Sequence, residues 1–389
     1  MNCSSIRLAP AVLLLAAALS APGAARSAPT VVKMATLAPE GSSWFRVLQE
    51  MGEEWRKASD GAVTLRIYPG GVAGDEDAMI RKMRVGQIQA AAITGIGLAY
   101  LEPSFYALHI PMMYASDEEF DSVRDRYAPV LERKMEEKGF VVLNWGDAGW
   151  VHFFSKTPVV TPAEAKALKL FQWSGDTNLV QLYKETGFHP VPLSTNDLLP
   201  GLQTGMVDAY SSTPLVSLAF QWFGLAPHMA DLRYAPLTGA TVIEKRTWEK
   251  IPPGLRPKLL EASRRAGLRL RAEIRRLNQE ALEVMAKNGL KVHKVPPEVQ
   301  AQWRKMVEDV HPRIRGKIMP AEAFDTVKRY RDEYRAAQRS GKSAVHLVLP
   351  IINTVTNPNR SRKPLRLRDS HFGCVASEGD SVRGSPCGE

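Results

Sequence analysis

Cysteine is scarce in this sequence, which has three in 389 residues and none between Arg26 and Ala337. A fold without cysteine over this length cannot depend on disulfide bridges or on thiolate metal ligands. Cys374 and Cys387 lie near the C-terminus and could pair with each other if that segment is exported. With 44% apolar residues, the chain can instead bury two cores, which predicts two domains plus extensions.

Motifs of catalysis are also missing. The sequence has no HExxH pair, no GxSxG elbow and no phosphate-binding glycine loop followed by Lys-Ser. Gly95-Ile96-Gly97 lacks the third glycine of a dinucleotide-binding fingerprint. A lone histidine is more often a packed or surface residue than a ligand, so we expect no catalytic residues, no metal site and no cofactor. The histidines of the central part occur singly, at His109, His152, His189, His228, His293 and His311.

A long hydrophobic run is found only at the N-terminus. Residues 1–27 have the layout of a secretory signal, with Arg7, then an apolar stretch from Leu8 to Leu19, then small residues. The apolar stretch is too short to span a bilayer, which favours a cleaved signal peptide over the alternative of an uncleaved anchor. No later segment is long and apolar enough to cross a membrane. We therefore expect a soluble mature protein in the periplasm.

The formal net charge of +10 is unevenly distributed. From Gly341 onward, seven Lys or Arg residues stand against four acidic residues, and Arg7 adds another positive charge in the leader. The central part is only mildly basic, which is weak support for nucleic-acid binding, and we expect no nucleic-acid partner. The hydrophobic periodicity stops after Gly341, and residues 339–389 are interpreted as a disordered or adventitious extension.

One structural unit occurs twice in the sequence. Residues 77–95 and residues 196–214 both read as an amphipathic helix, a glycine stop and a buried strand, and each follows an extended segment. A single offset aligns Met79 with Leu198 and Gly86 with Gly205. Because βαβ units recur in many folds, coincidence is the alternative. Two copies so far apart nevertheless favour two similar lobes over a solenoid.

The remaining segments complete an α/β prediction. We expect a turn at residues 145–150, with two glycines and two tryptophans, to be the first crossing between lobes, and an extended run at residues 237–243 to be the return. Residues 257–287 predict one long helix, whose arginines form either a solvated face or a docking patch for an acidic partner. The predicted domains are lobe I at 28–150 plus about 238–255, lobe II at 151–237, and packed helices at 256–338.

The candidate binding residues lie at strand ends and helix starts. In open α/β sheets, ligands bind beyond the carboxyl ends of the strands, near helix N-termini. Polar and aromatic side chains gather at these places, although each tryptophan could equally be a core residue. The candidate ligand-binding set is Thr36, Trp44, Thr94, Trp145, Trp150, Gln172, Trp173, Asp176, Tyr210, Ser211 and Thr213.

Five segments together resemble the DctP-like family of solute receptors from tripartite ATP-independent periplasmic (TRAP) transporters. They are KMATLAPEGSSWF, YPGGVAGDEDAMIRKMRVGQIQAAA, HIPMMY, GFHPVPLSTNDLLPGLQTGMVDA and TWEKIPPGLRPKLLEAS, in this order, within about residues 31–338. The resemblance implies an α/β, two-lobed periplasmic-binding-protein fold (type II-like) with hinge strands and a long bridging helix. It also implies a small-molecule solute, no cofactor, no enzymatic activity, and delivery to an ion-gradient-driven TRAP permease. We expect a monomer.

The chain departs from the family pattern at one important place. The family usually has an arginine that pairs with a ligand carboxylate, whereas here the strand ends in Phe171, Gln172 and Trp173. None of these side chains supplies a bidentate charged clamp. We expect a less acidic, more apolar or aromatic solute rather than a simple dicarboxylate, held by Trp173 and neighbouring tryptophans. The alternatives are an exported sensor that signals to a membrane protein, and a secreted enzyme on the same scaffold.

Overall fold

The computed structural model describes residues 29–340, which all lie within one unit of the chain. The predicted signal peptide at residues 1–27, the cysteines near the C-terminus and the tail beyond residue 340 lie outside the described residues. Within residues 29–340, no helix combines the length and the apolar character that a membrane crossing requires.

The first half of the sheet has β1 (Thr30–Thr36) between β2 (Val63–Tyr68) and β3 (Ala90–Thr94), all parallel. Helix α1 (Ser43–Ala58) buries one face, as its apolar spacing predicts, and α2 (Glu76–Arg84) precedes β3. The buried residues of α1 are Phe45, Leu48, Met51 and Trp55. Because β1 and β3 are parallel neighbours, their carboxyl ends meet at one edge of the sheet.

The second half repeats this arrangement. Strand β5 (Lys169–Trp173) lies between β6 (His189–Leu193) and β7 (Ala209–Ser212), again in parallel. The connecting elements are α6 (Thr177–Glu185), the 3-10 turn η2 (Thr195–Asp197) and α7 (Leu198–Thr204). Gly86 and Gly205, which the repeat aligns, both have a left-handed backbone, with φ of 76° and 73°. The predicted duplication is confirmed.

Two long antiparallel strands join the halves. β4 (Phe140–Ser155) and β8 (His228–Glu244) pair along their whole length, and β3 pairs with the end of β8 while β7 pairs with the end of β4. The prediction of a turn at residues 145–150 is therefore wrong. The glycines there are accommodated by register shifts within the strand, and Gly149 has a φ of 101°. Ser211 and Ser212 belong to β7.

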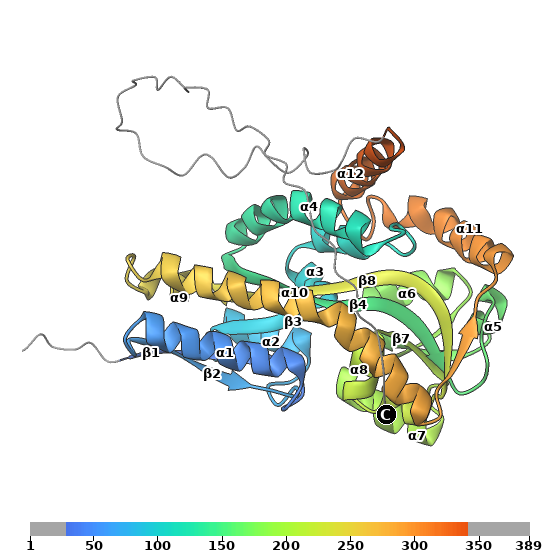
Figure 1. The fold of residues 1–389 in the computed structure, drawn as a ribbon, viewed down its shortest axis with the longest axis horizontal. Coiled ribbons are helices and arrows are strands. Elements are labelled where there is room, and N and C mark those ends of the chain that lie inside the picture. Colours follow the sequence, from blue (N-terminus) through green and yellow to red (C-terminus); the bar gives the residue numbers. More distant parts are fainter. Residues whose placement is uncertain (1–28, 341–389) are drawn as a thin grey trace, which may run out of the picture. The chain divides into compact units, whose positions relative to one another are not determined.

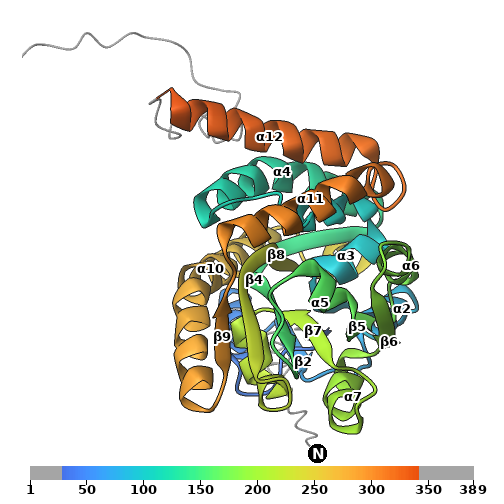
Figure 2. The ribbon, with the colours of Figure 1, turned by 90° about the vertical axis from the view of Figure 1, so that its right-hand side faces the viewer.

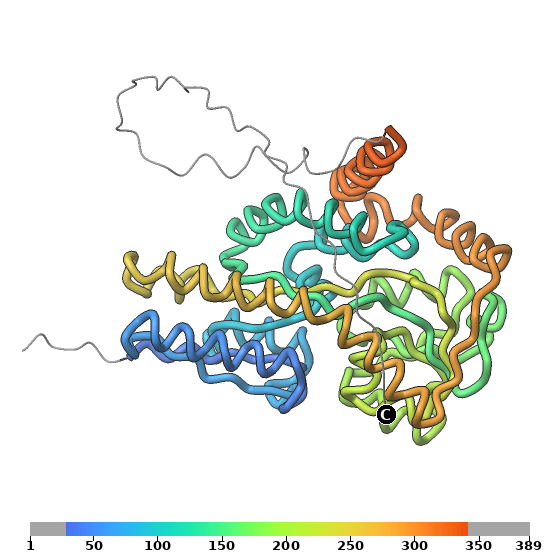
Figure 3. The backbone as a smooth tube through the Cα atoms, in the orientation of Figure 1, coloured from blue at the N-terminus to red at the C-terminus, as the bar shows by residue number. Residues whose placement is uncertain are grey.

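Helix α10 (Arg256–Lys287) bridges both halves, as Figures 1 and 3 show in yellow and orange. Near its start, the Trp55 indole Nε1 donates to the Leu259 carbonyl at 3.0 Å. Near its end, the Asn278 side chain donates to the Ala148 carbonyl of β4 at 2.9 Å and accepts from the Leu215 amide at 3.1 Å. The long bridging helix of the prediction is therefore confirmed.

The arginines of α10 pair largely with acidic residues of α1 and of α4 (Asp117–Glu137). Arg269 lies 2.9 Å from Glu54 of α1, and Arg275 lies 2.6 Å from Asp121 of α4. These ion pairs tie α10 to its neighbours, while the arginine side chains stay 26–61% exposed, as the predicted solvated face requires. The docking patch for an acidic partner stays a prediction.

The remaining elements cover the sheet and its edges. Figure 2 shows α4, α11 and α12 stacked on one side of β4 and β8, and Glu119 of α4 accepts from Arg335 of α12 at 3.2 Å. These elements are α3 (Gly95–Leu101), η1 (Pro103–His109), α5 (Pro162–Lys166), α8 (Pro214–Ala219), η3 (Trp222–Gly224), α9 (Lys245–Lys250), β9 (Lys291–Lys294), α11 (Pro297–Ile314) and α12 (Ala321–Arg339).

Candidate functional site

A cavity of about 270 Å³ lies where the carboxyl ends of the parallel strands from the two halves face each other. The first half contributes the ends of β1 and β3 and the starts of α1 and α2, and the second contributes the ends of β5 and β7. The middle of β4, the middle of β8 and two residues of α10 close its wall. This is the place at which open α/β sheets bind ligands.

Part of the predicted ligand-binding set lies in the lining of this cavity. The structure brings together polar and aromatic residues from strands that are far apart in the sequence. Whether each one contacts a ligand stays a prediction. The predicted residues in the lining are Thr36, Trp44, Thr94, Trp173 and Ser211.

Two predicted tryptophans lie elsewhere. Trp145 stacks on Phe105 at 5.6 Å between ring centroids and donates from Nε1 to Glu132 at 2.9 Å. Trp150 donates from Nε1 to Asp117 at 3.1 Å. Both indole N–H groups are therefore satisfied within the protein, as buried tryptophans require.

The other predicted residues outside the lining cap helices or pack within the protein. Asp176 caps α6, accepting from the Leu179 amide at 2.9 Å, and also accepts a hydrogen bond from the Tyr106 hydroxyl. Tyr210 is buried with its ring stacked on Phe154 at 5.0 Å. The last two are Gln172, which is buried, and Thr213, which caps α8.

Trp173 and Ser211 stand out within the lining. The Trp173 indole Nε1 and the Ser211 hydroxyl are buried, and neither has a hydrogen-bond partner among residues 29–340. Buried polar groups in proteins are nearly always hydrogen-bonded, so each orphan requires an explanation. The Trp173 ring packs over Gly175, where an added Cβ would lie 2.3 Å from a ring carbon. A residue larger than glycine at position 175 would therefore displace the ring.

Glu76 is a lining residue that the sequence prediction missed. An acidic residue in the first turn of a helix commonly complements the helix dipole, but the Glu76 side chain lines the cavity and is 3% exposed. Its carboxylate accepts from the Thr94 amide at 2.6 Å and from the Thr94 hydroxyl at 2.8 Å. Burial raises the pKa of Glu76 to about 7, with Asp75 adding to the shift and the hydrogen bonds from Thr94 opposing it.

Asp147 is the second carboxylate of the lining and sits in the middle of β4. It accepts from the fully buried Arg124 guanidinium of α4 at 2.8 and 3.0 Å. The backbone carbonyl of Asp147 accepts from the Trp44 indole at 3.1 Å. The charge of Asp147 is thus balanced by Arg124, and Trp44 is held against β4.

The charged side chains of the lining are all acidic. Among the described residues that line the cavity, none is lysine, arginine or histidine. The rest of the wall is apolar or neutral, with aromatic rings from both halves of the protein. These rings belong to Trp44, Phe171, Trp173, Phe220 and Trp222.

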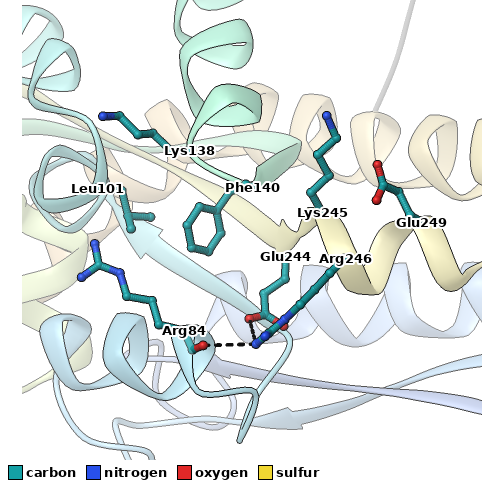
Figure 4. A pocket seen from close by; sticks show the side chains of 9 residues that line it. Arg84, Leu101, Lys138, Phe140, Glu244, Lys245, Arg246 and Glu249 are labelled. Carbon is teal, nitrogen blue, oxygen red and sulfur yellow. Dashed lines mark hydrogen bonds and ion pairs between the residues drawn. The ribbon is translucent and has the colours of Figure 1, made fainter.

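A second pocket, of about 450 Å³, lies at the opposite edge of the sheet (Figure 4). It is formed where β4 begins and β8 ends, and Arg84, Lys138 and Lys245 stand around it. Arg246 there is held by Glu244 at 2.5 Å and by the Arg84 carbonyl at 3.2 Å. This pocket is away from the carboxyl ends of the strands, so the interlobe cavity is the better candidate.

In the part of the chain that the structure describes, no three His, Cys, Asp or Glu side chains are grouped to hold a metal ion. Two histidines that appear isolated in the sequence do meet, since His228 Nδ1 lies 2.8 Å from His293 Nε2.

Comparison with known proteins identifies one family. The family described as bacterial extracellular solute-binding protein, family 7 (DctP), matches residues 34–317. The C4-dicarboxylate-binding periplasmic protein DctP of Rhodobacter capsulatus is 24% identical over 326 residues, covering 81% of this chain and 94% of that protein. The 2,3-diketo-L-gulonate-binding periplasmic protein YiaO of Escherichia coli is 24% identical, covering 61% of this chain and 73% of that protein.

Solved structures agree on the fold. A sugar acid binding protein from Advenella mimigardefordensis in complex with galactonate superposes with a TM-score of 0.74 at 17% identity, covering 79% of this chain and 99% of its own. A TRAP periplasmic solute binding protein from Citrobacter koseri with bound D-glucuronate gives a TM-score of 0.70 at 23% identity, covering 77% and 98%. The two-lobed α/β periplasmic-binding fold predicted from the sequence is confirmed.

Proposed function

The chain belongs to the DctP family of bacterial extracellular solute-binding proteins, family 7, and we propose that it captures a small organic molecule in the interlobe cavity. The family consists of binding receptors rather than enzymes. In this proposal, the protein acts as a monomer in the periplasm after its signal peptide has been cleaved. It delivers the captured molecule to the membrane subunits of a TRAP permease driven by an ion gradient.

The observation that carries the proposal is the pair of orphan polar atoms in the cavity, Trp173 Nε1 and Ser211 Oγ. A buried donor left without a partner costs about 1–3 kcal/mol, so a partner from outside the protein restores this free energy. A solute with a hydrogen-bond acceptor near the indole N–H would do so. Both residues lie at strand ends of the second half, while Thr36 and Thr94 face them from the first half. A solute bound among these four residues contacts both halves at once.

The solute in this proposal is not a simple dicarboxylate. Phe171 occupies the place at which the family usually carries a carboxylate-binding arginine, and it lines the cavity here. The lining residues described above include no basic side chain that could replace the arginine. Recognition of two carboxylates would require bidentate or charge-assisted donors, which the wall does not supply.

Thermal denaturation of the purified mature protein against a panel of metabolites tests the proposal. The panel includes D-glucuronate, galactonate and succinate, which are bound by structural neighbours, together with neutral and aromatic compounds. We expect at least one compound to raise Tm, because a ligand at 100 times its Kd stabilises the folded state by about 2.7 kcal/mol.

Solution scattering then separates a two-lobe site from a one-lobe site. We expect a stabilising compound also to reduce the radius of gyration, since contacts with both halves favour closure. A panel in which no compound raises Tm, or a bound compound that the protein chemically converts, would overturn the proposed receptor function.

A further inference from the structure

We propose that the solute carries an ammonium group on an apolar body, and that the Glu76 carboxylate binds this group inside the cavity. This inference rests on the proposed receptor function and specifies the chemical class of its solute. It departs from the sugar acids and dicarboxylates bound by the related proteins named above.

The first argument is the balance of charge around the cavity. Of the two carboxylates in the lining, Asp147 is matched by Arg124 at 2.8 Å. Glu76 forms no ion pair with any described residue, and its hydrogen-bond donors are all uncharged, from Thr94 and from the backbone of Gly97. A buried ionised carboxylate without a counter-charge is strongly unfavourable. A positively charged group on the solute would supply the counter-charge, while a carboxylate on the solute would add to the repulsion.

The second argument is the aromatic content of the same wall. Aromatic rings attract cations through their π faces, and clusters of such rings recognise substituted ammonium groups. Here the rings come from both halves, so they also supply apolar surface for the remainder of the solute. Phe220 and Trp222 stack on each other at 4.7 Å between centroids, which gives this side of the cavity a rigid surface.

The alternative solute is neutral, with Glu76 protonated and donating a hydrogen bond. Geometry alone accommodates this state, because a protonated carboxyl can donate from one oxygen and accept at the other. The two cases differ in one measurable respect. An ammonium solute loses affinity when its charge is removed at constant shape, while a neutral solute does not.

A matched series of small probes makes this comparison. We would titrate the purified protein by calorimetry with 2-phenylethylamine, 2-phenylethanol and phenylacetate, which share a phenyl ring and differ in the charge of the terminal group. We expect the amine to bind at least about tenfold more tightly than the alcohol, because a hydrogen bond between charged groups contributes about 1.5–3 kcal/mol. Phenylacetate should bind most weakly, because its carboxylate is repelled by Glu76. Equal affinity for amine and alcohol, tighter binding of phenylacetate, or no binding of the amine at millimolar concentration would overturn the inference.

A variant pair assigns the effect to one carboxylate. Glu76→Gln keeps the shape of the side chain and removes its charge, so we expect amine affinity to fall about tenfold or more and alcohol affinity to stay the same. Asp77→Asn is the matched control, because Asp77 is the next residue of α2 and pairs outward with Arg81 at 2.5 Å. It should leave both affinities unchanged. If Glu76→Gln does not fold, the three-probe comparison on the unmodified protein remains decisive.

The same measurements separate failure of this inference from failure of the receptor function. If D-glucuronate, galactonate or succinate binds and the amine does not, the receptor function stands and the ammonium class is wrong. If neither the probe series nor the metabolite panel raises Tm or releases heat, the receptor function is wrong as well.

Discussion

Asp75 of the first half accepts a hydrogen bond from the backbone amide of Thr195 in the second half, at 2.7 Å. The same aspartate is the N-cap of α2, with its side chain accepting from the Glu76 amide at 2.8 Å. Asp176 combines two roles in the same way, since it caps α6 and accepts from the Tyr106 hydroxyl of the first half. Two helix-capping aspartates, one in each half, therefore connect the two halves across the cavity.

The contact between Asp75 and Thr195 should favour the closed form. Thr195→Pro removes the amide donor, and the site tolerates proline because Thr195 is the first residue of η2 and Ser194 before it is extended, with ψ of 159°. A hydrogen bond to a charged group contributes about 1.5–3 kcal/mol, so we expect solute affinity to fall about tenfold or more. Calorimetry and solution scattering would measure this loss and the accompanying expansion. Thr195→Val keeps the amide and removes only the longer hydroxyl contact with Asp75, at 3.4 Å, so it should lose less affinity than Thr195→Pro. Equal affinities of the two variants would argue against the amide contact.

The orphan indole of Trp173 predicts opposite effects on stability and on binding. Trp173→Phe keeps an aromatic ring and removes a buried N–H that has no partner within residues 29–340. We expect the free energy of unfolding of the solute-free protein to stay the same or to rise by about 1 kcal/mol, since a desolvation penalty is removed. Solute affinity should fall. Urea denaturation and calorimetry measure the two quantities.

Trp145→Phe is the control for this experiment. The Trp145 indole donates to Glu132 at 2.9 Å and lies outside the lining. Its removal should lower the free energy of unfolding by about 1 kcal/mol and leave solute affinity unchanged. A Trp173→Phe protein that is both less stable and equally able to bind would contradict the proposed role of the indole.

Local sequence was sufficient for much of this fold. The bounds of α1 follow from the capping side chain of Ser42 and from an apolar face that repeats at helical spacing. The duplication could be read from Gly86 and Gly205, because a helix that ends in a left-handed residue strongly favours glycine at that position. Both signals act over a few residues and need no knowledge of a partner.

The continuity of β4 and the negative charge of the cavity depend on contacts between residues far apart in the sequence, and local sequence did not reveal them. Residues 145–150 contain turn-forming glycines, yet β8 pairs with them, so they continue a strand. Glu76 resembles an ordinary first-turn acid, and only the hydrogen bonds from Thr94, on the next strand, turn it into the cavity. Contacts with residues distant in the sequence decided both cases, and such contacts leave little trace in local composition.

The raised pKa of Glu76 predicts a stability that falls as pH rises. Burial raises the pKa of this carboxyl to about 7 in the folded protein, above its ordinary value in the unfolded chain. Below the unfolded pKa, both states are protonated and burial costs little. Between the two pKa values the folded state binds the proton more tightly, so stability is lost progressively and the loss is complete above pH about 7.

Urea denaturation of Glu76→Gln across this pH range measures the effect. The variant should gain up to ~3 kcal/mol on the unmodified protein at high pH and little at low pH, since each pKa unit corresponds to about 1.4 kcal/mol. Asp77→Asn is again the control, and it should not reproduce the pH dependence. A difference between Glu76→Gln and the unmodified protein that is constant with pH would show that the carboxyl titrates at its ordinary value.

Substitution of Arg124, whose buried guanidinium joins α4 to β4, should strongly lower the free energy of unfolding. Arg124 is 0% exposed and pairs with Asp121 at 2.8 Å, with Asp125 at 3.2 Å and with Asp147 at 2.8 Å. Arg124→Met removes the charge but keeps an apolar stem, and leaving a buried carboxylate unpaired costs about 3–5 kcal/mol. We expect this loss in the free energy of unfolding, together with weaker solute binding, because Asp147 lines the cavity. Arg276→Met is the control, because it breaks an exposed pair with Glu280 and should change neither quantity measurably. Equal effects of the two variants would show that the pair between Arg124 and Asp147 does not stabilise the fold.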